Sequence, residues 1–305
     1  MTVTSSTPSG ERADVKVGFA CNNCCVFCAQ GERRDACAAV PQAELEERLV
    51  KARTRTRSLV LTGGEPTAYR HLVAVIRRAR QLGFDPIQVQ TNGRMLSYPR
   101  VLDVLLRAGA SEFSPALHGS TADLHDSLTR APGSFAETVA GIRNVVSSRA
   151  SLVTNSVVVR QNLHDLAALV TLLSSLGVQN MQLALVHPVG TAAERFDEVV
   201  PRLPAIVEPL TRACAAARAA GVRLVTEAVP LCFLPGMESL AVEASIPDTT
   251  VFDYDGASLD YSAWRAGEGK LHGPPCARCA ARGRCEGPWK EYPERFGWDE
   301  FQPVR

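Results

Sequence analysis

Gly18-Phe-Ala-Cys21-Asn-Asn-Cys24-Cys25-Val-Phe27-Cys28 is the most informative stretch of this chain, because it holds four cysteines within eight residues. The apolar run Val15–Ala20 predicts a strand directly before it, so the cysteines fall in a loop at the carboxyl end of that strand. α/β barrels place their chemistry at that end. The spacing Cys21-x3-Cys25-x2-Cys28 supplies three thiolates to a four-iron cluster and leaves one iron open to a substrate or cofactor. The same residues form two abutting CxxC pairs, so the spacing alone leaves zinc as an alternative.

The composition limits the class of protein. The chain has 305 residues, a formal net charge of +1 and 46% hydrophobic residues, which suffices for one large domain or two modest ones. The balanced charge gives no reason to expect nucleic acid as a partner. No apolar run approaches the roughly 20 residues of a membrane span, and residues 1–14 lack the pattern of a signal peptide. We expect a disordered tail over 1–14, a cytoplasmic protein and no membrane partner.

A second group of cysteines lies near the end of the chain. Cys276, Cys279 and Cys285 form a C-x2-C-x5-C run, and Cys232 lies upstream. In a reducing compartment such grouping indicates metal or redox chemistry rather than disulfides. The four thiolates are a complete set for zinc or for a second iron–sulfur cluster. By contrast, Cys214 on an alanine-rich helix is expected to be a buried apolar side chain.

Short apolar runs alternate with longer helical patterns through the first 225 residues. This alternation predicts βαβ units, a parallel sheet and hence an α/β fold. The expected strands are Val15–Ala20, Leu59–Thr62, Ile87–Gln90, Glu112–Leu117, Leu152–Arg160, Val178–His187 and Val222–Thr226. The expected helices are Gln42–Arg53, Leu72–Leu82, Val101–Ala108, Phe135–Ser148, Leu163–Leu176 and Leu203–Ala220. Residues 226–305 lack such periodicity and are expected to form a small, loop-rich domain stabilised by bound metal.

A glycine-rich turn follows the second expected strand, in Leu59-Val-Leu-Thr-Gly63-Gly64-Glu65-Pro66-Thr67. Glycines without a Cβ allow a ligand to approach the backbone closely. The carboxylate of Glu65 is an acceptor suited to an ammonium group. Taken alone, this motif could be only a turn.

Together, the CxxxCxxC loop and the Gly-Gly-Glu-Pro turn resemble the radical S-adenosylmethionine (SAM) superfamily. The resemblance covers roughly Val15–His187 and implies a partial (β/α)6 TIM-like barrel of the radical SAM type. It also implies a [4Fe-4S] cluster on Cys21, Cys25 and Cys28, SAM on its open iron, a 5′-deoxyadenosyl radical as product, and a flavodoxin- or ferredoxin-type electron donor. Ala116 departs from the family, which commonly has serine there. The implied cofactor-binding residues are Phe27, Gly63, Gly64, Glu65, Pro66, Asn92, Ser114 and Asn155.

The C-terminal cysteines resemble the auxiliary-cluster domains of this superfamily, called SPASM or twitch domains. The larger SPASM pattern continues C-x2-C-x5-C-x3-C, and this chain has Trp289 in place of the last cysteine. The resemblance therefore implies one auxiliary [4Fe-4S] cluster in a twitch-like domain over 226–305, with zinc as the alternative. Cys232 is expected to complete the ligand set with Cys276, Cys279 and Cys285; otherwise it is a hydrogen-atom donor near the substrate.

Polar residues at strand ends supply candidates for substrate contact. His118 and His187 follow the fourth and sixth strands at the active face and are the candidate catalytic residues, with Cys232 as the third. His125, at the start of a helix, is expected to be solvated. Further candidates with an equally plausible structural role are Glu227, Asp253, Tyr254 and Tyr261.

The function that this pattern favours is hydrogen abstraction from a C–H bond of a small polar substrate such as a sugar, cyclitol or nucleoside, giving dehydrogenation or epimerisation. Maturation of a ribosomally made peptide is the alternative, and the short segment before the first strand argues against a leader-binding domain. An electron-transfer or metal-sensing protein is a third hypothesis, which residues 63–66 disfavour.

Overall fold

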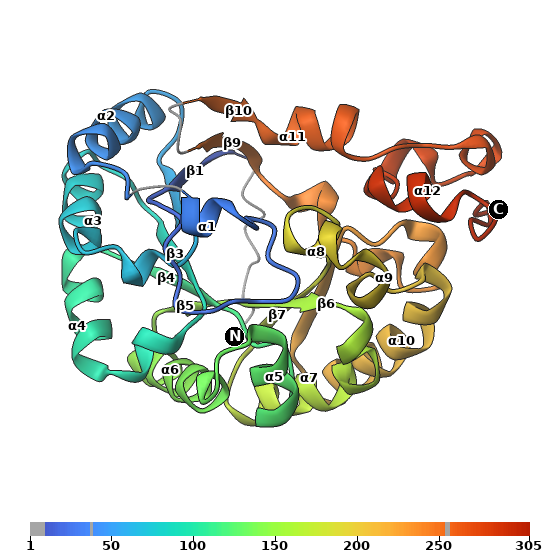
Figure 1. Ribbon diagram of the computed structural model, residues 1–305, viewed down its shortest axis with the longest axis horizontal. Coiled ribbons are helices and arrows are strands. Elements are labelled where there is room, and N and C mark those ends of the chain that lie inside the picture. Colours follow the sequence, from blue (N-terminus) through green and yellow to red (C-terminus); the bar gives the residue numbers. More distant parts are fainter. Residues whose placement is uncertain (1–9, 37–38, 254–256) are drawn as a thin grey trace.

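The computed structural model describes residues 10–36, 39–253 and 257–305 (Figure 1). Its strands alternate with helices for most of the chain, as expected for an α/β fold. The strands are β1 (Glu11–Lys16), β2 (Ser58–Thr62), β3 (Ile87–Thr91), β4 (Glu112–Pro115), β5 (Ser151–Leu152), β6 (Thr154–Val158), β7 (Asn180–Leu185), β8 (Arg223–Glu227), β9 (Asp248–Phe252) and β10 (Ser258–Asp260).

The strands form two sheets that follow one another around the molecule. The larger has the order β10-β9-β1-β2-β3-β4-β5, and the smaller has the order β6-β7-β8. Only Val153 separates β5 from β6, so the chain passes from the larger sheet to the smaller one at a single residue. The two sheets together are called the wall. All pairs are parallel except β9 with β10. The carboxyl ends of the parallel strands therefore meet at one edge, where ligands of such folds bind.

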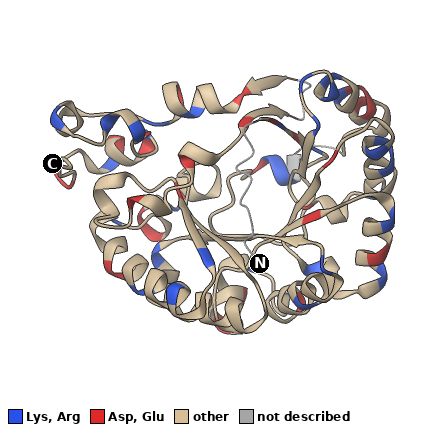
Figure 2. Cartoon of the chain, turned by 180° about the vertical axis from the view of Figure 1, so that it is seen from behind, with Lys and Arg blue, Asp and Glu red and all other residues tan. Residues whose placement is uncertain are grey.

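Helices cover the outside of this wall (Figure 1). Several end at a glycine in the left-handed conformation, such as Gly109 (φ 118°) and Gly221 (φ 66°), which terminates a helix without a Cβ clash. The longer helices are α2 (Gln42–Arg53), α3 (Leu72–Gln81), α4 (Pro99–Ala108), α5 (Ala122–Thr129), α6 (Ser134–Ser148), α7 (Leu166–Ser175) and α10 (Leu203–Ala220). The short ones are α1 (Arg33–Ala36), α8 (Thr191–Glu194), α9 (Phe196–Val199), α11 (Tyr261–Trp264) and α12 (Glu291–Phe296). Positive and negative side chains are interspersed over the outer helices (Figure 2).

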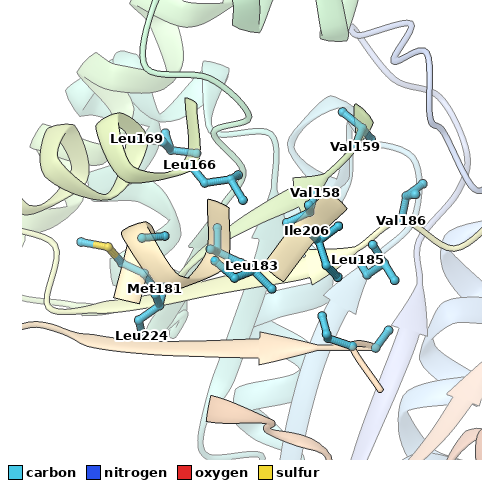
Figure 3. Packing of buried hydrophobic residues seen from close by; sticks show 14 of the residues in the cluster. Val158, Val159, Leu166, Leu169, Met181, Leu183, Leu185, Val186, Ile206 and Leu224 are labelled. Atoms are coloured by element: carbon cyan, nitrogen blue, oxygen red, sulfur yellow. The ribbon is translucent and has the colours of Figure 1, made fainter. Parts of the chain in front are cut away.

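Strand alternation separates an apolar outer face from a polar inner one. In Figure 3, Val158, Leu183 and Leu185 of the smaller sheet pack with Ile206 of α10 in the buried core. On β1 the apolar residues are fully buried, whereas the alternate residue Asp14 lines an interior cavity. Because successive side chains point to opposite faces of a strand, this pattern presents polar groups to the interior of the wall.

The α/β class and the six expected helices are confirmed, but the expected boundaries of several strands are not. β1 begins at Glu11, so the expected tail over 1–14 is wrong for its last residues, and residues 1–9 lie outside the described part. The expected strand Leu152–Arg160 is interrupted at Val153 and ends at Val158. β9 and β10 extend the larger sheet beside β1, so 226–305 is not purely loop-rich. No helix among the described residues is long and apolar enough to cross a membrane.

Candidate active site

The cysteine loop is held by α5, a helix whose bounds were not among those predicted from the sequence. The amide of Cys24 donates to the carbonyl of Thr129 (2.8 Å), and the amide of Val26 donates to the carbonyl of Leu128 (2.9 Å). Both acceptors lie at the carboxyl end of α5, where carbonyls have no partner within the helix. The loop amides thereby provide donors for the terminal carbonyls of α5, and the same hydrogen bonds fix the backbone of the loop. The thiols it carries are positioned by long-range contacts, not by their spacing alone.

Three of the four thiols in this loop face a common cavity. Cys21, Cys25 and Cys28 line an interior cavity of about 430 Å³, whereas Cys24 is exposed. Burial raises the pKa of Cys21 to about 11, and burial with the neighbouring Cys28 and Cys21 raises the pKa of Cys25. Three thiolates gathered in this way require a compensating cation. The donor set therefore fits an iron–sulfur cluster, in which thiolates are stabilised by iron.

Gly63 and Gly64 lie at the end of β2, directly against the strand-to-loop turn of β1. The amide of Gly64 donates to the carbonyl of Gly18 (2.8 Å). A Cβ on Gly63 would lie 2.1 Å from the Gly18 oxygen, and one on Gly64 would lie 2.1 Å from the Phe19 oxygen. Both glycines line the cavity. The contact explains why this turn needs glycine twice and why it offers bare backbone to a ligand.

The carboxylate of Glu65 is occupied by the protein itself. Its side chain is 2% exposed and accepts from the Thr67 amide (2.9 Å) and hydroxyl (2.6 Å) and from the Thr91 hydroxyl (2.6 Å) through Oε1. Oε2 accepts from the Asn92 amide (2.6 Å). Burial raises the pKa of this carboxyl despite these bonds. Glu65 thus joins the turn after β2 to the end of β3, and Pro66 begins the short helical turn that follows.

The other expected SAM-binding residues are divided between the cavity and its surroundings. Asn92 lines the cavity, with its Nδ2 at 4.0 Å from the Cys21 sulfur. Asn155 also lines it, and within the described residues its buried Oδ1 has no hydrogen-bond partner. Phe27 lines it as well, edge-on to His118 at 4.8 Å between ring centroids. Ser114 is buried on β4 beside the cavity wall. An unpartnered acceptor such as Asn155 is the group that a bound polar cofactor would satisfy.

His118 is a neutral side chain with a defined tautomer. Its Nδ1 accepts from the Val157 amide (3.2 Å), so its proton lies on Nε2. Burial, with the neighbouring His125, lowers the pKa of His118 to about 3. His125 is fully buried and accepts from the His118 amide through Nδ1 (3.0 Å), so the expectation that it is solvated is wrong. The fourth strand thus carries a neutral N–H donor at the cavity.

These two histidines predict a pH dependence of stability. Burial lowers the pKa of His125 to about 4, from a usual value of 6.5. Because the unfolded chain then binds more protons, their stabilising contribution is present above pH 6.5 and is lost as the pH falls toward 4. We expect His125→Asn, which keeps an acceptor, to make the free energy of unfolding less dependent on pH. Its slope against pH, measured by urea unfolding between pH 5 and 7, should decrease by up to about 1.4 kcal/mol per pH unit. The exposed His164→Asn is the control, and equal slopes in both variants would contradict the assignment.

His187 lies where the barrel meets the C-terminal region. Its ring stacks on Trp289 at 3.8 Å between centroids, and its Nε2 lies 3.7 Å from the Glu291 carboxylate. His187 and Trp289 both line the cavity that contains the cluster thiols. Trp289, which stands in place of the further SPASM cysteine, therefore forms part of the wall of the same cavity. In the sequence, Trp289 was informative only because it replaces a cysteine, and its contact with His187 was not predicted.

The four C-terminal cysteines come together around a second, much smaller cavity. Cys232, Cys276, Cys279 and Cys285 line a space of about 20 Å³. Burial and the neighbouring Cys285 raise the pKa of Cys232 to about 12. Backbone amides point at the sulfurs, including the Leu231 amide at 3.5 Å from Cys285. Among residues 10–36, 39–253 and 257–305, no three Cys, His, Asp or Glu side chains converge on a single-ion site. Four thiols around one cavity are a donor set for an iron–sulfur cluster or for zinc.

Among the remaining candidates, two lie at the active cavity and one does not. Glu227 and Tyr261 line it. Asp253 forms ion pairs with Arg33 (3.0 Å) and Lys16 (3.5 Å) beside β1, which is a structural role. Tyr254 lies outside the described residues, as does Cys37. Asp14 was missed, although the alternation of polar and apolar residues along β1 already signals its inward orientation.

Fold and site together define an α/β protein of the partial-barrel type, in which a three-cysteine loop and a glycine turn line one cavity. The model of the Radical SAM superfamily matches residues 15–173, and the chain belongs to that superfamily. The probable GTP 3′,8-cyclase of Saccharolobus solfataricus is 31% identical over 186 residues, which are 60% of this chain and 59% of that protein. The AdoMet-dependent heme synthase of Methanosarcina barkeri is 29% identical over 187 residues, 59% of this chain and 52% of that protein. The chain thus matches little more than half the length of these relatives.

Solved structures share the fold over most of the chain. SuiB of Streptococcus suis bound to S-adenosylmethionine superposes with a TM-score of 0.67 at 14% identity, covering 91% of this chain and 72% of that one. Native anSMEcpe with bound AdoMet gives a TM-score of 0.67 at 12% identity, covering 96% of this chain and 93% of that one. The α/β barrel-type fold is thereby confirmed, and the radical SAM assignment is confirmed by the superfamily model; the twitch-like region stays a prediction. At this identity the likeness concerns the fold alone.

Proposed function

We propose that this chain cleaves SAM reductively at a cluster on Cys21, Cys25 and Cys28 and removes a hydrogen atom from a small polar substrate in the same cavity. The observation that carries the proposal is that the three thiols, the two turn glycines and the candidate substrate residues His118 and His187 line one cavity of about 430 Å³. A radical must be made within reach of its target, since diffusion would expose it to side reactions. A flavodoxin- or ferredoxin-type donor would supply the electron.

The residues have separate roles in this proposal. When bound, SAM and the cluster supply a 5′-deoxyadenosyl radical. Cys21, Cys25 and Cys28 hold the irons, and the backbone at residues 63–64 permits close approach of the amino acid part of SAM. Glu65 acts as a positioning residue, because its carboxylate accepts from the backbone amide of Asn92, whose side-chain Nδ2 lies 4.0 Å from the Cys21 sulfur. Asn155 offers its open oxygen to the cofactor.

A second [4Fe-4S] cluster in the C-terminal region forms part of the proposal. Support comes from the four thiols around one small cavity and from the amides that point at them. We expect about eight irons per chain after anaerobic reconstitution and about four in Cys232→Ala, measured by iron analysis and EPR spectroscopy. Four irons with one zinc in the unsubstituted chain would contradict the second cluster.

The placement of Cys232 also favours one reaction outcome. Cys232 lines the small cavity together with the other three thiols, so we assign it as a ligand and not as a hydrogen donor. A fully ligated cluster can take the electron from a substrate radical that has lost a proton, which completes a two-electron oxidation. In D2O, such a dehydrogenation gives a product two mass units lighter, measured by mass spectrometry. Solvent deuterium in a product of unchanged oxidation state would instead indicate epimerisation by a thiol donor.

A peptide substrate is the second candidate. It is favoured by structures of this fold described as SuiB bound to precursor peptide SuiA and as anSMEcpe bound to a peptide, which superpose with TM-scores of 0.66 and 0.55. The same mass measurement applied to a peptide library would detect it. A nucleoside triphosphate is a further substrate class suggested by the cyclase relatives. The cavity lining contains the cations Lys16 and Arg34 as well as the carboxylates Asp14 and Glu227.

A further inference from the structure

Two carboxylates lie on the cavity wall that is formed by β1 and β8. Asp14 projects from the inner face of β1, and Glu227 is the last residue of β8. Both groups are close enough to Tyr261 to raise the pKa of its phenol, after burial, which is the larger cause. The two carboxylates and the weakly acidic phenol of Tyr261 therefore share one part of the cavity. Ala228, directly after Glu227, adopts a left-handed conformation (φ 63°), which is uncommon for a residue with a Cβ.

Each carboxylate has a hydrogen-bond donor in the protein but no direct ion-pair partner among the described residues. Asp14 accepts a hydrogen bond from the Thr62 hydroxyl through Oδ1, and Glu227 accepts from Gln182 through Oε2 (2.5 Å). In the part of the chain that the structure describes, neither forms an ion pair. Burial raises the pKa of both carboxyl groups, and the carboxylate of Glu243 adds to the effect at Glu227.

Three cations near this wall pair with other carboxylates. Lys16 lies 3.5 Å from the Asp253 carboxylate. Lys270 and Arg265 both lie 2.8 Å from Glu286. Arg12 also lies near both carboxylates, and its charge offsets part of the effect of burial on their pKa values. A buried carboxylate without a partner is unfavourable, whereas one that meets a ligand cation becomes a strong recognition element. Because neither Asp14 nor Glu227 forms an ion pair among the described residues, both remain available to a ligand cation.

An aromatic surface adjoins the two carboxylates. Trp289 is 4% exposed and stacks on His187, and both rings line the cavity. Among the described residues the indole Nε1 of Trp289 has no hydrogen-bond partner. A buried N–H donor without an acceptor is rare in proteins and suits a ligand that carries a hydroxyl or carbonyl oxygen. Aromatic faces also attract organic cations and cover apolar ring faces.

We infer that this part of the cavity binds a protonated amine of the substrate, with Asp14 and Glu227 accepting from the ammonium group and the indole N–H of Trp289 donating to a ligand oxygen. The inference rests on the proposed function and specifies its substrate class as a small, oxygen-bearing organic amine. The ammonium group of SAM belongs to the cluster end of the cavity, at the turn of Gly63 and Gly64. Phosphorylated substrates are disfavoured because two carboxylates would repel them.

The inference is tested with a pair of ligands that differ in charge and little else. D-Glucosamine and D-glucose are titrated at pH 7 into the chain loaded with its clusters and SAM, and Kd is measured by ligand-detected NMR spectroscopy. We expect the amine to bind at least tenfold more tightly. Asp14→Asn and Glu227→Gln are each expected to remove this preference, and D-glucose 6-phosphate is expected to bind more weakly than either.

A matched carboxylate provides the control. Glu112 on β4 is also partly buried, with a raised pKa, and accepts from the Gln88 side chain (3.3 Å) as Glu227 does from Gln182. It is not among the residues around the cavity, so Glu112→Gln should keep the preference for the amine. Equal or undetectable binding of both sugars, or a preference that survives both Asp14→Asn and Glu227→Gln, would overturn the inference. Failure of the unsubstituted chain to form 5′-deoxyadenosine would refute the proposed function instead, and the binding ratio would still decide this question.

Discussion

Replacing Cys25 by alanine is expected to abolish the dithionite-dependent formation of 5′-deoxyadenosine from SAM. Cys25 lies between Cys21 and Cys28 in the loop and lines the cavity with them. A four-iron cluster held by two thiolates has two open irons and loses its stability. We expect product formation, measured by chromatography under anaerobic conditions, to fall at least a thousandfold. The iron bound at this site should be lost in parallel.

The same loop offers a control one residue away. Cys24 is exposed, and only its backbone is used, through the amide that donates to Thr129. Cys24→Ala keeps that amide and should retain both iron and activity. If Cys24→Ala lost activity as Cys25→Ala does, the ligand set would have to be reassigned to the abutting CxxC pairs. Activity retained in Cys25→Ala would remove the radical SAM mechanism from this chain.

The sequence predicted the elements whose signal is local. Helices such as Gln42–Arg53 and Leu203–Ala220 carry their apolar period within themselves, and their bounds agree with the structure to the residue. β9 was missed because its five residues sit between irregular segments and become a strand only by pairing with β1, more than 230 residues earlier. Pairing between distant segments leaves little trace in a short window of sequence.

The same distinction applies to the site. The cysteine spacing and the Gly-Gly-Glu-Pro turn were sufficient to predict one shared cavity, since both follow parallel strands. The sequence could not show that the carboxylate of Glu65 is taken up by Thr67, Thr91 and Asn92, because those bonds depend on how two turns meet. Nor could it show that Trp289 reaches the barrel and stacks on His187. Motif residues were found; the contacts that assign their roles were not.

Gly64→Ala is expected to remove SAM binding without removing the cysteine loop. The added Cβ would lie 2.1 Å from the Phe19 oxygen and 2.6 Å from the Ala20 oxygen, distances that real Cβ atoms do not reach. The turn after β2 must therefore move away from the turn after β1, which breaks the hydrogen bond from the Glu65 amide to Ala20 (2.8 Å). A displacement of about 1 Å in a positioned group costs about 100-fold, and we expect a loss of that size in SAM affinity by equilibrium dialysis.

Two further measurements separate this loss from general unfolding. Gly267→Ala adds the same methyl group where no atom lies within 4 Å, so it should bind SAM as the unsubstituted chain does. Iron content should stay unchanged in Gly64→Ala, because the hydrogen bonds from the Cys24 and Val26 amides to α5 hold the cysteine loop independently of the β2 turn. Normal SAM affinity in Gly64→Ala would mean that the turn does not approach the cofactor. Loss of iron together with SAM would mean that the glycine turn also supports the cluster loop, through the Phe19 and Ala20 carbonyls that both segments share.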